Sequence, residues 1–396
     1  MIGTLEHWKA KREDPRELSM TYSGQFYTLC QELQAEALVV AQRKGGRCVH
    51  DGRMTIRECA TLFDTSSSAV FYHLGQIIGG LRLAWLAWWF GADLALVSNG
   101  THWFMLTLLR LMGIHVVPDL HCTLWPTGHP PARRIRRWVA AVNGWFWRRV
   151  PSATMCISPE CERQVRAIAR HAPAGTLLPT RPTYRREVFD EIGTPDHEAR
   201  PFVLFYAGRI ERDKGVFDLL ALMQRLHAAS PGMYRCIFCG TGGALGELAG
   251  AVQAAGLEKT VRLSGQLNQN ELREQLAAAH VVVVPTTASF VEGLNRVAVE
   301  AVLACRPAIV TSICPASELI SAAAIVVKPG DVPAMYEAIC RLAGDAGYYA
   351  KLCAACPPLA AQFYDPARSW GSQVAQAVRM ALPEHFQGVR AVGRFA

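Results

Sequence analysis

The stretch Phe202-Val-Leu-Phe-Tyr-Ala-Gly-Arg-Ile-Glu-Arg-Asp-Lys-Gly215 decides the fold of this chain of 396 residues. It begins with an apolar run that predicts a buried strand and continues as a polar, glycine-containing turn, after which a helical pattern follows. The same order recurs at Val281-Val-Val-Val-Pro285, which leads through a short polar segment into Glu292-Gly-Leu-Asn-Arg-Val-Ala-Val-Glu-Ala301. Repeated strand, turn and helix predict an open parallel α/β sheet, in which ligands bind beyond the carboxyl ends of the strands.

Charged side chains of opposite sign occupy the two turns. Arg209 and Lys214 follow Gly208 in the first turn, and Glu292 and Glu300 belong to the second turn and its helix. A guanidinium and an ammonium can hold a diphosphate and offset the charge that it gains as it leaves, whereas carboxylates suit the hydroxyls of a sugar. The pair of turns therefore predicts a nucleotide-sugar site. The alternative is that both turns carry only solvated surface charges.

The helix after the second turn adds backbone donors to this predicted site. If the helix begins near Gly293, Glu292 lies at its mouth, and the amides of Gly293, Leu294 and Asn295 face the ligand at the positive end of the helix dipole. Glu300 then lies inside the helix, about two turns further along.

A third turn, Gly240-Thr-Gly-Gly243, raises the alternative of a dinucleotide-binding enzyme. Leu245 stands where the fingerprint G-x-G-x-x-G needs its last glycine, which argues against a nicotinamide enzyme. Gly265 and Leu267, after the predicted strand 260–264, are candidates for contact with a nucleobase.

The G-R-x4-K-G turn and the E-x7-E element resemble the donor site of retaining, family-4-type glycosyltransferases with the two-domain GT-B fold. The likeness is strong over 200–330 and weaker over 20–180, where Tyr22-Ser-Gly-Gln-Phe26 is similar to bacterial exopolysaccharide-type members. The resemblance implies that Glu292 holds hydroxyls of the donor sugar and that Glu300 holds the ribose diol of the nucleotide. It also implies that the leaving phosphate takes the proton of the acceptor.

Two residues of the first half enter through this resemblance. Gly24 matches the glycine that lets the backbone approach the diphosphate, and His121, after the predicted strand 114–118, matches a histidine that reaches the reacting sugar. A satisfied structural histidine stays open as the alternative for His121. Glycosyltransferases of the other major fold hold a metal with an Asp-x-Asp pair, which this sequence lacks. We therefore expect neither a metal nor a cofactor.

Strands alternate with helices along the chain, which predicts an α/β protein. The length favours two domains, and the irregular stretch 179–200 marks their boundary. With the resemblance, we expect two Rossmann-like doubly wound domains that face a cleft. These are an acceptor-binding domain at 1–182, a nucleotide-sugar-binding domain at 183–365, and a final helix at 366–396 that returns to the first domain. Strands of the first domain are expected at 36–42, 93–98, 114–118 and 155–158.

Charge and cysteine spacing narrow the classes of function. The formal net charge of +8 suits an anionic ligand or surface. Cys236 and Cys239 lie on a predicted strand at a spacing that points them to opposite sides, and Cys353 and Cys356 have no second pair nearby, so we expect no metal or disulfide framework. A reducing cytoplasmic compartment follows. The charged segment 1–15 does not resemble a secretory signal.

The segment 132–150 predicts an amphipathic helix that lies on a membrane. Its apolar residues share one stripe at helical spacing, namely Ile135, Trp138, Val142, Trp145 and Phe146. Arginines lie mostly beside this stripe, namely Arg133, Arg134, Arg136, Arg137 and Arg148. Such a helix suits the surface of an anionic bilayer; the alternative is an ordinary helix packed on its own domain. The apolar region 77–97 is broken at Gly91-Ala-Asp93, so each part is too short to span a bilayer.

These features together predict a glycosyltransferase, peripheral on the inner face of the cell membrane. It would transfer a sugar with retention from a nucleotide-diphosphate sugar to an acceptor hydroxyl of a lipid-linked glycan, without a nucleic-acid partner. Two alternatives stay open. One is another GT-B enzyme, such as a nucleotide-sugar epimerase, and the other is a non-enzymatic protein that binds a membrane surface or nucleic acid.

Overall fold

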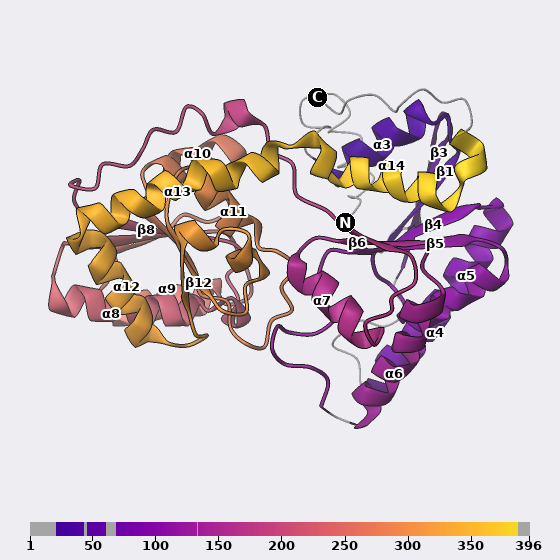
Figure 1. Ribbon diagram of the computed structural model, residues 1–396. Helices are drawn as coiled ribbons and strands as arrows, with labels where there is room; N and C mark the ends of the chain where they lie inside the picture. The colour runs from indigo at the N-terminus through magenta and orange to yellow at the C-terminus, as the bar shows by residue number, and fades with distance from the viewer. Residues whose placement is uncertain (1–20, 43–45, 61–68, 133, 387–396) are drawn as a thin grey trace. The chain divides into compact units, whose positions relative to one another are not determined.

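The computed structural model describes residues 21–42, 46–60, 69–132 and 134–386 (Figure 1). The chain divides into two compact units. The first unit comprises Met1–His121, Pro131–Tyr184 and Asp365–Ala396, and the second comprises Cys122–Pro130 and Arg185–Tyr364. All thirteen cysteines are free thiols.

In the described part of the chain, the second unit is built on a six-stranded parallel sheet. Its strands are β8 Phe202–Ala207, β9 Tyr234–Cys239, β10 Val261–Leu263, β11 Val281–Val284, β12 Ala308–Thr311 and β13 Ala324–Val327. They lie in the order β10-β9-β8-β11-β12-β13. The order reverses between β8 and β11, so the loops that leave these two strands meet at a topological switch point, where open α/β sheets bind ligands.

Helices cover both faces of this sheet. They are α8 Val216–Ala229, α9 Leu245–Ala254, α10 Gln269–Ala277, α11 Arg296–Leu303, α12 Val332–Gly344 and α13 Ala346–Tyr364. Figure 1 shows α8, α9 and α12 on one face and α10, α11 and α13 on the other. The strands are accordingly apolar on both sides, as parallel strands between two helical layers must be. Leu204, Phe238 and Val283 are all buried at their centre.

Among its described residues, the first unit has a four-stranded parallel sheet and a smaller three-stranded sheet. The parallel sheet has the order β4-β5-β6-β7, with strands β4 Leu94–Val97, β5 His115–Leu120, β6 Ala153–Cys156 and β7 Thr176–Pro179. The strands expected at 93–98, 114–118 and 155–158 are therefore confirmed, and β7 is an addition that the sequence reading did not include.

The strand expected at 36–42 forms but joins the smaller sheet. β1 Ala37–Gln42 pairs in parallel with β3 Met54–Cys59, and β3 pairs with β2 Cys48–Asp51 as an antiparallel hairpin. Val39, Met54 and Ile56 are buried together in a cluster of their own. Because the hairpin gives β1 both a hydrogen-bonding partner and an apolar contact, β1 is not drawn into the parallel sheet. The expectation that 36–42 belongs to one doubly wound sheet is thereby corrected.

The helices of the first unit are α3 Tyr22–Glu32, α4 Ala69–Phe90, α5 Thr107–Leu111, α6 Arg134–Arg149, α7 Pro159–Ile168 and α14 Trp370–Ala381, and the 3-10 helix η1 Trp103–Leu106 precedes α5. α14 packs against α3, β6 and β7. Trp370 and Val374 share a buried cluster with Leu29 and Met155, so a late segment of the chain completes the core of this unit. Among the described residues, no helix combines the length and the hydropathy that a bilayer crossing requires.

Candidate functional site

The turns after β8 and β11 are held against each other by close backbone contact. Gly215 adopts a φ of 74°, and a Cβ atom there would lie 1.9 Å from the carbonyl oxygen of Pro285, just beyond β11. Only glycine fits such a position. Thr287 donates through its amide at 3.0 Å and through its hydroxyl at 2.9 Å to the carbonyl oxygen of Asp213. The two turns that the sequence singled out are thus brought together at the switch point.

An ion pair joins the two turns. Nζ of Lys214 lies 2.9 Å from Oε2 of Glu292, and the two side chains are 13 % and 11 % exposed. The same oxygen accepts hydrogen bonds from Asn295 Nδ2 at 3.1 Å and from Thr286 Oγ1 at 3.5 Å. Three donors therefore fix the Glu292 carboxylate, which with about four lone-pair sites retains the capacity to accept from a ligand hydroxyl.

Phe290 lies against both cations of the predicted site. Its ring centre is 3.6 Å from Nζ of Lys214 and 5.5 Å from the guanidinium carbon of Arg209, distances at which cation–π attraction acts. Arg209 is exposed, and its carbonyl oxygen accepts a 2.7 Å hydrogen bond from the Tyr206 hydroxyl. Burial, followed by the charge of Glu292, raises the pKa of Tyr206, so the phenol remains a neutral donor that anchors the turn.

The helix after the second turn begins beyond Gly293. α11 starts at Arg296, and Asn295 is its N-cap, with a φ of 73° and a side chain that accepts a 3.1 Å hydrogen bond from the Ala298 amide. Gly293 and Leu294 are buried in the turn before the helix. A helix start near Gly293 is therefore not observed, because the asparagine cap fixes the start beyond it. Contact of the 293–295 segment with a ligand stays a prediction.

Glu300 and Thr123 also lie around the second turn. Oε1 of Glu300 is 3.8 Å from the guanidinium of Arg296, one helical turn earlier, and the Glu300 side chain is 16 % exposed. Thr123, which the sequence reading did not single out, donates through its hydroxyl at 3.1 Å and its amide at 3.4 Å to the carbonyl oxygen of Glu292. Thr123 thereby fixes the backbone that carries the Glu292 carboxylate.

Glycines allow the loops after β8, β9 and β10 to stack closely. A Cβ atom on Gly240 would lie 1.8 Å from the carbonyl oxygen of Gly208, and the Gly240 amide donates to the carbonyl oxygen of Gly265 at 2.6 Å. Gly208 and Gly265, both predicted to bind ligand, thus shape this edge of the sheet through the backbone. Leu267 lies half-buried in the loop between β10 and α10.

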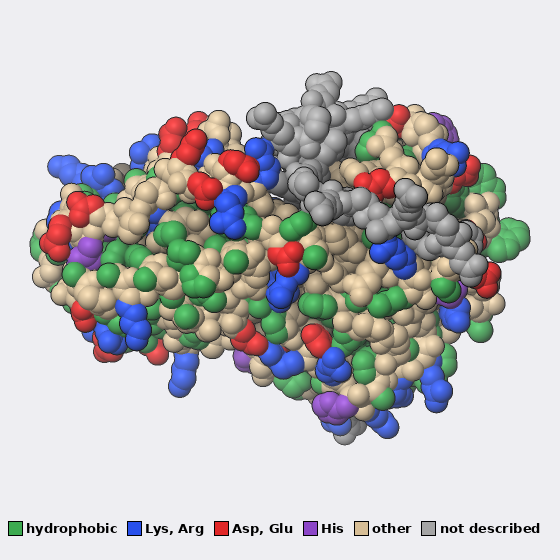
Figure 2. All heavy atoms as spheres, turned by 45° about the horizontal axis from the view of Figure 1, so that its top comes forward, with side chains coloured by type: hydrophobic (Ala, Val, Ile, Leu, Met, Phe, Trp, Pro, Cys, Tyr) green, Lys and Arg blue, Asp and Glu red, His purple; other side chains and the backbone are tan. Residues whose placement is uncertain are grey.

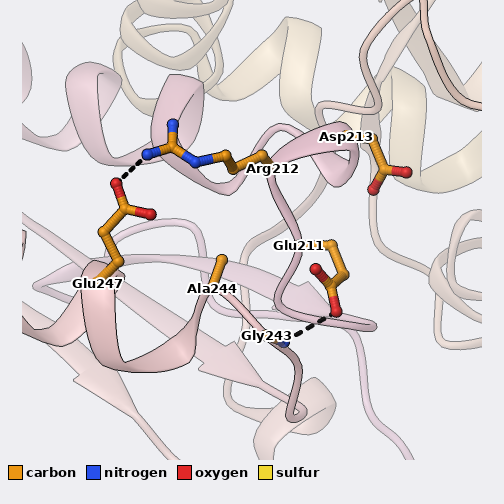
Figure 3. Close-up of a pocket in the computed structure, with 6 residues that line it drawn as sticks. All are labelled: Glu211, Arg212, Asp213, Gly243, Ala244 and Glu247. Atoms are coloured by element: carbon orange, nitrogen blue, oxygen red, sulfur yellow. Dashed lines mark hydrogen bonds and ion pairs between the residues drawn. The ribbon is translucent and has the colours of Figure 1, made fainter. Parts of the chain in front are cut away.

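A hollow beside the first turn is acidic. Its lining residues are Glu211, Arg212, Asp213, Gly243, Ala244 and Glu247. Figure 3 shows Arg212 paired with Glu247, and Glu211 accepting a hydrogen bond of 2.8 Å from the Gly243 amide. Three carboxylates against one guanidinium make this hollow unsuited to a phosphate group. The cations that suit a phosphate are those that contact Phe290.

His121 belongs to the first unit, where Asp119 holds it. Nε2 of His121 lies 2.7 Å from Oδ2 of Asp119, which is almost fully buried. The same oxygen accepts hydrogen bonds from Trp370 Nε1 at 3.0 Å and from Ser98 Oγ at 3.2 Å, and the Tyr22 ring centre lies 4.8 Å from that of the imidazole. Asp119 and Trp370 were not anticipated. The available signal was a carboxylate inside an apolar strand, shortly before the histidine.

Gly24 lies in a helix. It occupies the first turn of α3, where its amide donates to Oγ1 of the N-cap residue Thr21 at 3.1 Å. The resemblance matched Gly24 to the glycine that lets the backbone approach a diphosphate, and that role stays a prediction. In the structure the threonine caps a helix at this point, and the Gly24 amide donates to its side chain.

The basic segment 132–150 forms α6, but its predicted apolar stripe is partly buried and partly exposed. Phe146 is fully buried beside Trp147, whereas Trp138 and Trp145 are 65 % and 47 % exposed. One edge of the predicted stripe therefore packs on the first unit, and the two exposed tryptophans remain at the surface. Arg137 is exposed. The structure does not describe Arg133 or the side chains of Arg134 and Arg136.

Comparison with known proteins shows which enzymes this chain is similar to. The family described as "Glycosyl transferases group 1" matches residues 190–356. The chain is 27 % identical over 305 residues to the 2-deoxystreptamine N-acetyl-D-glucosaminyltransferase of Streptomyces fradiae, which covers 70 % of this chain and 72 % of that enzyme. Its structure is similar to sucrose-phosphate synthase from Thermosynechococcus elongatus, with a TM-score of 0.67 and 17 % identity. The match covers 91 % of this chain and 93 % of that one. It is also similar to HepE of Anabaena in complex with UDP, with a TM-score of 0.63 and 18 % identity. This match covers 89 % of this chain and 95 % of that one.

The matched range contains both turns of the candidate site, and the solved structures share the α/β architecture of GT-B glycosyltransferases. The expected fold class and the expected enzyme class are therefore confirmed. The protein is a glycosyltransferase of the GT-B fold, and its residues 190–356 match the family described as "Glycosyl transferases group 1".

Proposed function

We propose that this enzyme transfers a sugar from a nucleotide-diphosphate sugar to an acceptor hydroxyl, with retention of the anomeric configuration. One observation carries the proposal, namely the Lys214–Glu292 ion pair of 2.9 Å at the switch point of the second unit. The ammonium suits the diphosphate of the donor, and the carboxylate suits the hydroxyls of its sugar. The structure of HepE with UDP supports the nucleotide class.

The two cations act on the leaving group. As the bond between the anomeric carbon and the diphosphate oxygen breaks, negative charge develops on the diphosphate. Lys214 and Arg209, both placed by Phe290, offset that charge with little rearrangement at the moment of reaction. Glu292, fixed by Asn295, orients the sugar. The leaving phosphate takes the acceptor's proton, and the new bond forms on the same face of the sugar.

The remaining roles follow the same proposal. Glu300 holds the ribose diol of the nucleotide, and Gly265 and Leu267 contact its nucleobase. His121, fixed by Asp119 at 2.7 Å, reaches the reacting sugar. No step requires a divalent cation, because Lys214 and Arg209 neutralise the negative charge of the diphosphate. Transfer should therefore persist in excess chelator; activity that disappears there and returns with magnesium or manganese would contradict this.

For the acceptor we propose a lipid-linked glycan, met at the inner surface of a membrane. The net charge of +8 suits an anionic leaflet. Trp138 and Trp145 on α6 are exposed beside the exposed Arg137, a combination typical of helices that lie in a membrane interface.

A nucleotide-release assay tests the reaction. The protein is incubated with a panel of nucleotide sugars, with and without lipid extract, and the products are identified by NMR. Release that depends on an acceptor, with the anomeric configuration retained, supports the proposal. Conversion of the donor sugar into its epimer without an acceptor would identify a nucleotide-sugar epimerase instead, and an inverted product would refute retention.

Lys214→Met tests the site, with Arg212→Met as the matched control. Both cations belong to the same turn, but Arg212 pairs with Glu247 in the acidic hollow (Figure 3). Loss of the Lys214 charge should lower turnover about a hundredfold or more, as expected for a lost donor to a developing anion. Arg212→Met should stay near the wild type. Equal turnover in the two variants would remove Lys214 from the mechanism.

A further inference from the structure

Helix α4 presents a continuous row of large apolar side chains to solvent. The residues recur at intervals of three and four, which places them on one face of the helix. The row consists of Val70, Leu74, Ile77, Leu81, Trp85 and Trp88, and their exposed fractions lie between 37 % and 74 %. Phe71 and Trp89 extend it sideways. A row of this length on one helix exceeds the scattered apolar residues of an ordinary protein surface.

The opposite face of α4 already supplies the contacts that hold the helix on its unit. Cβ atoms on Gly79 and Gly80 would each lie 2.6 Å from atoms of the segment 100–105, so α4 packs there at close range. Leu86 is buried on this face. The helix is therefore apolar around most of its circumference although only one face is covered. In a helix of this kind, the exposed face requires a partner outside the folded unit.

Neighbouring elements extend the exposed apolar surface. α4 packs against η1 and α5, and η1 also packs against α6. Figure 1 shows α4, α5 and α6 at one side of the first unit. Leu111 at the end of α5 and the adjoining Met112 are exposed, as are Trp138 and Trp145 on α6. The exposed row on α4 therefore belongs to a wider apolar surface in which three helices take part.

The charge of this region identifies the partner's chemistry. Residues 69–150 contain eight arginines and no lysine, against Asp93 and the buried Asp119 as the only acidic residues. Elsewhere the two signs of charge are mixed, as the face drawn in Figure 2 shows. The partner must therefore be both apolar and anionic. A second copy of this chain fits poorly, because a two-fold interface would bring the same arginines together.

We propose that α4 is the principal membrane-docking element of this enzyme, lying in the interface of an anionic phospholipid bilayer with its apolar row inserted. Tryptophans favour the boundary between headgroups and acyl chains, and arginines beside them attract an anionic leaflet. This inference deepens the proposed function and rests on its lipid-linked acceptor. In this proposal α4 inserts into the bilayer, whereas α6 contributes arginines and lies at the edge of the membrane contact.

Vesicle binding by the full chain tests the assignment. The probes are vesicles of phosphatidylcholine mixed with phosphatidylglycerol, and vesicles of phosphatidylcholine alone. The wild type should bind the mixed vesicles and should not bind the vesicles of phosphatidylcholine alone. Leu81→Gln with Trp85→Gln should weaken that binding about tenfold or more, because two inserted side chains lose apolar burial. Met380→Gln, an exposed apolar position on α14, is the control and should bind as the wild type does.

A second readout separates α4 from α6. Brominated lipids should quench the fluorescence of Trp85, Trp88 and Trp89 on α4, and replacing these three by Phe should remove most of the quenching. Trp138→Gln with Trp145→Gln should weaken binding less than the α4 variant does. If only the α6 variant loses binding, the enzyme docks through α6 and the α4 assignment is overturned.

The remaining outcomes are equally decisive. Wild-type protein that binds no vesicles overturns docking altogether. If the wild type sediments as a dimer and the α4 variant as a monomer, a second copy of the chain covers this face and the membrane assignment is overturned. The α4 variant should keep normal turnover on a water-soluble acceptor, because α4 carries none of the proposed catalytic residues. If vesicle binding depends on α4 while no nucleotide sugar is turned over, the proposed function fails and this inference stands.

Discussion

Glu292 and Glu300 stand eight positions apart in the sequence but are held in different ways. Glu292 pairs with Lys214, whereas Glu300 lies within α11 beside Arg296. Glu300→Gln should weaken binding of a nucleoside diphosphate about tenfold, since a charge-assisted hydrogen bond to the ribose is lost. Glu292→Gln should keep or raise that affinity, because it releases Lys214 toward the phosphates, while transfer falls. Calorimetry with the nucleoside diphosphate measures both variants, and the opposite order would exchange the two roles.

We expect Asp119 to orient His121, because its buried carboxylate lies 2.7 Å from the imidazole. Its Oδ2 contacts the His121 imidazole and accepts hydrogen bonds from Trp370 and Ser98. Asp119→Asn preserves the size of the side chain, but its amide group can present a hydrogen-bond donor to the imidazole in place of an acceptor. Turnover should fall by up to about a hundredfold, with donor affinity nearly unchanged, because a mispositioned group acts mainly on the chemical step. Nitrogen NMR should show an altered tautomer of His121. Ser98→Ala, which removes the longest of the three contacts, is the control; an unchanged tautomer in Asp119→Asn would refute the positioning role.

At the scale of elements, the packing of η3 Arg212–Lys214 and α8 against the end of β11 depends on one glycine. Gly215→Ala would both strain a left-handed residue and drive a Cβ atom into the Pro285 carbonyl. We expect a loss of about 2 kcal/mol or more in the free energy of unfolding. Gly232→Ala shares the left-handed φ but meets no atom within 4 Å, so it should cost only about 1 kcal/mol. Urea unfolding compares the two, and equal losses would mean that the contact with Pro285 is unimportant.

The sequence predicted the elements whose patterns are local. The runs at 202–207 and 281–284 are purely apolar and end in polar turns, so both strands and their functional turns could be recognised before the structure. The extent of α13 was not predicted, because Pro357 and Pro358 lie inside it and such residues normally end a helix. β1 was recognised as a strand but assigned to the wrong sheet, because pairing partners depend on tertiary contacts.

The site was predictable to a similar extent. That Arg209, Lys214 and Glu292 come together could be predicted, because each belongs to a turn that follows a strand, at the edge where parallel sheets bind ligands. Phe290, which contacts both cations, was missed because an aromatic residue in a turn has no distinctive spacing. The support of His121 by Trp370 joins residues 251 positions apart, a contact that no local pattern reveals.

At the scale of the molecule, α14 is a structural part of the first unit. Trp370→Ala would empty a buried site and remove a hydrogen bond to Asp119, so it should destabilise that unit by about 3–5 kcal/mol. Met380→Ala on the exposed side of the same helix should cost little. Hydrogen exchange followed by mass spectrometry should show lost protection in β5 and β6, with the strands of the second unit unchanged. Equal loss in both units would mean that they unfold together.

The same arrangement has a consequence for biosynthesis. The ribosome makes the chain from its amino end, and domains generally fold as units as they emerge. The second unit is complete once Tyr364 has emerged, but the first unit still waits for Trp370 and Val374 to fill its core. The first half of the chain must therefore remain incompletely packed while the later-made unit folds, which makes it the natural client of a chaperone on the nascent chain.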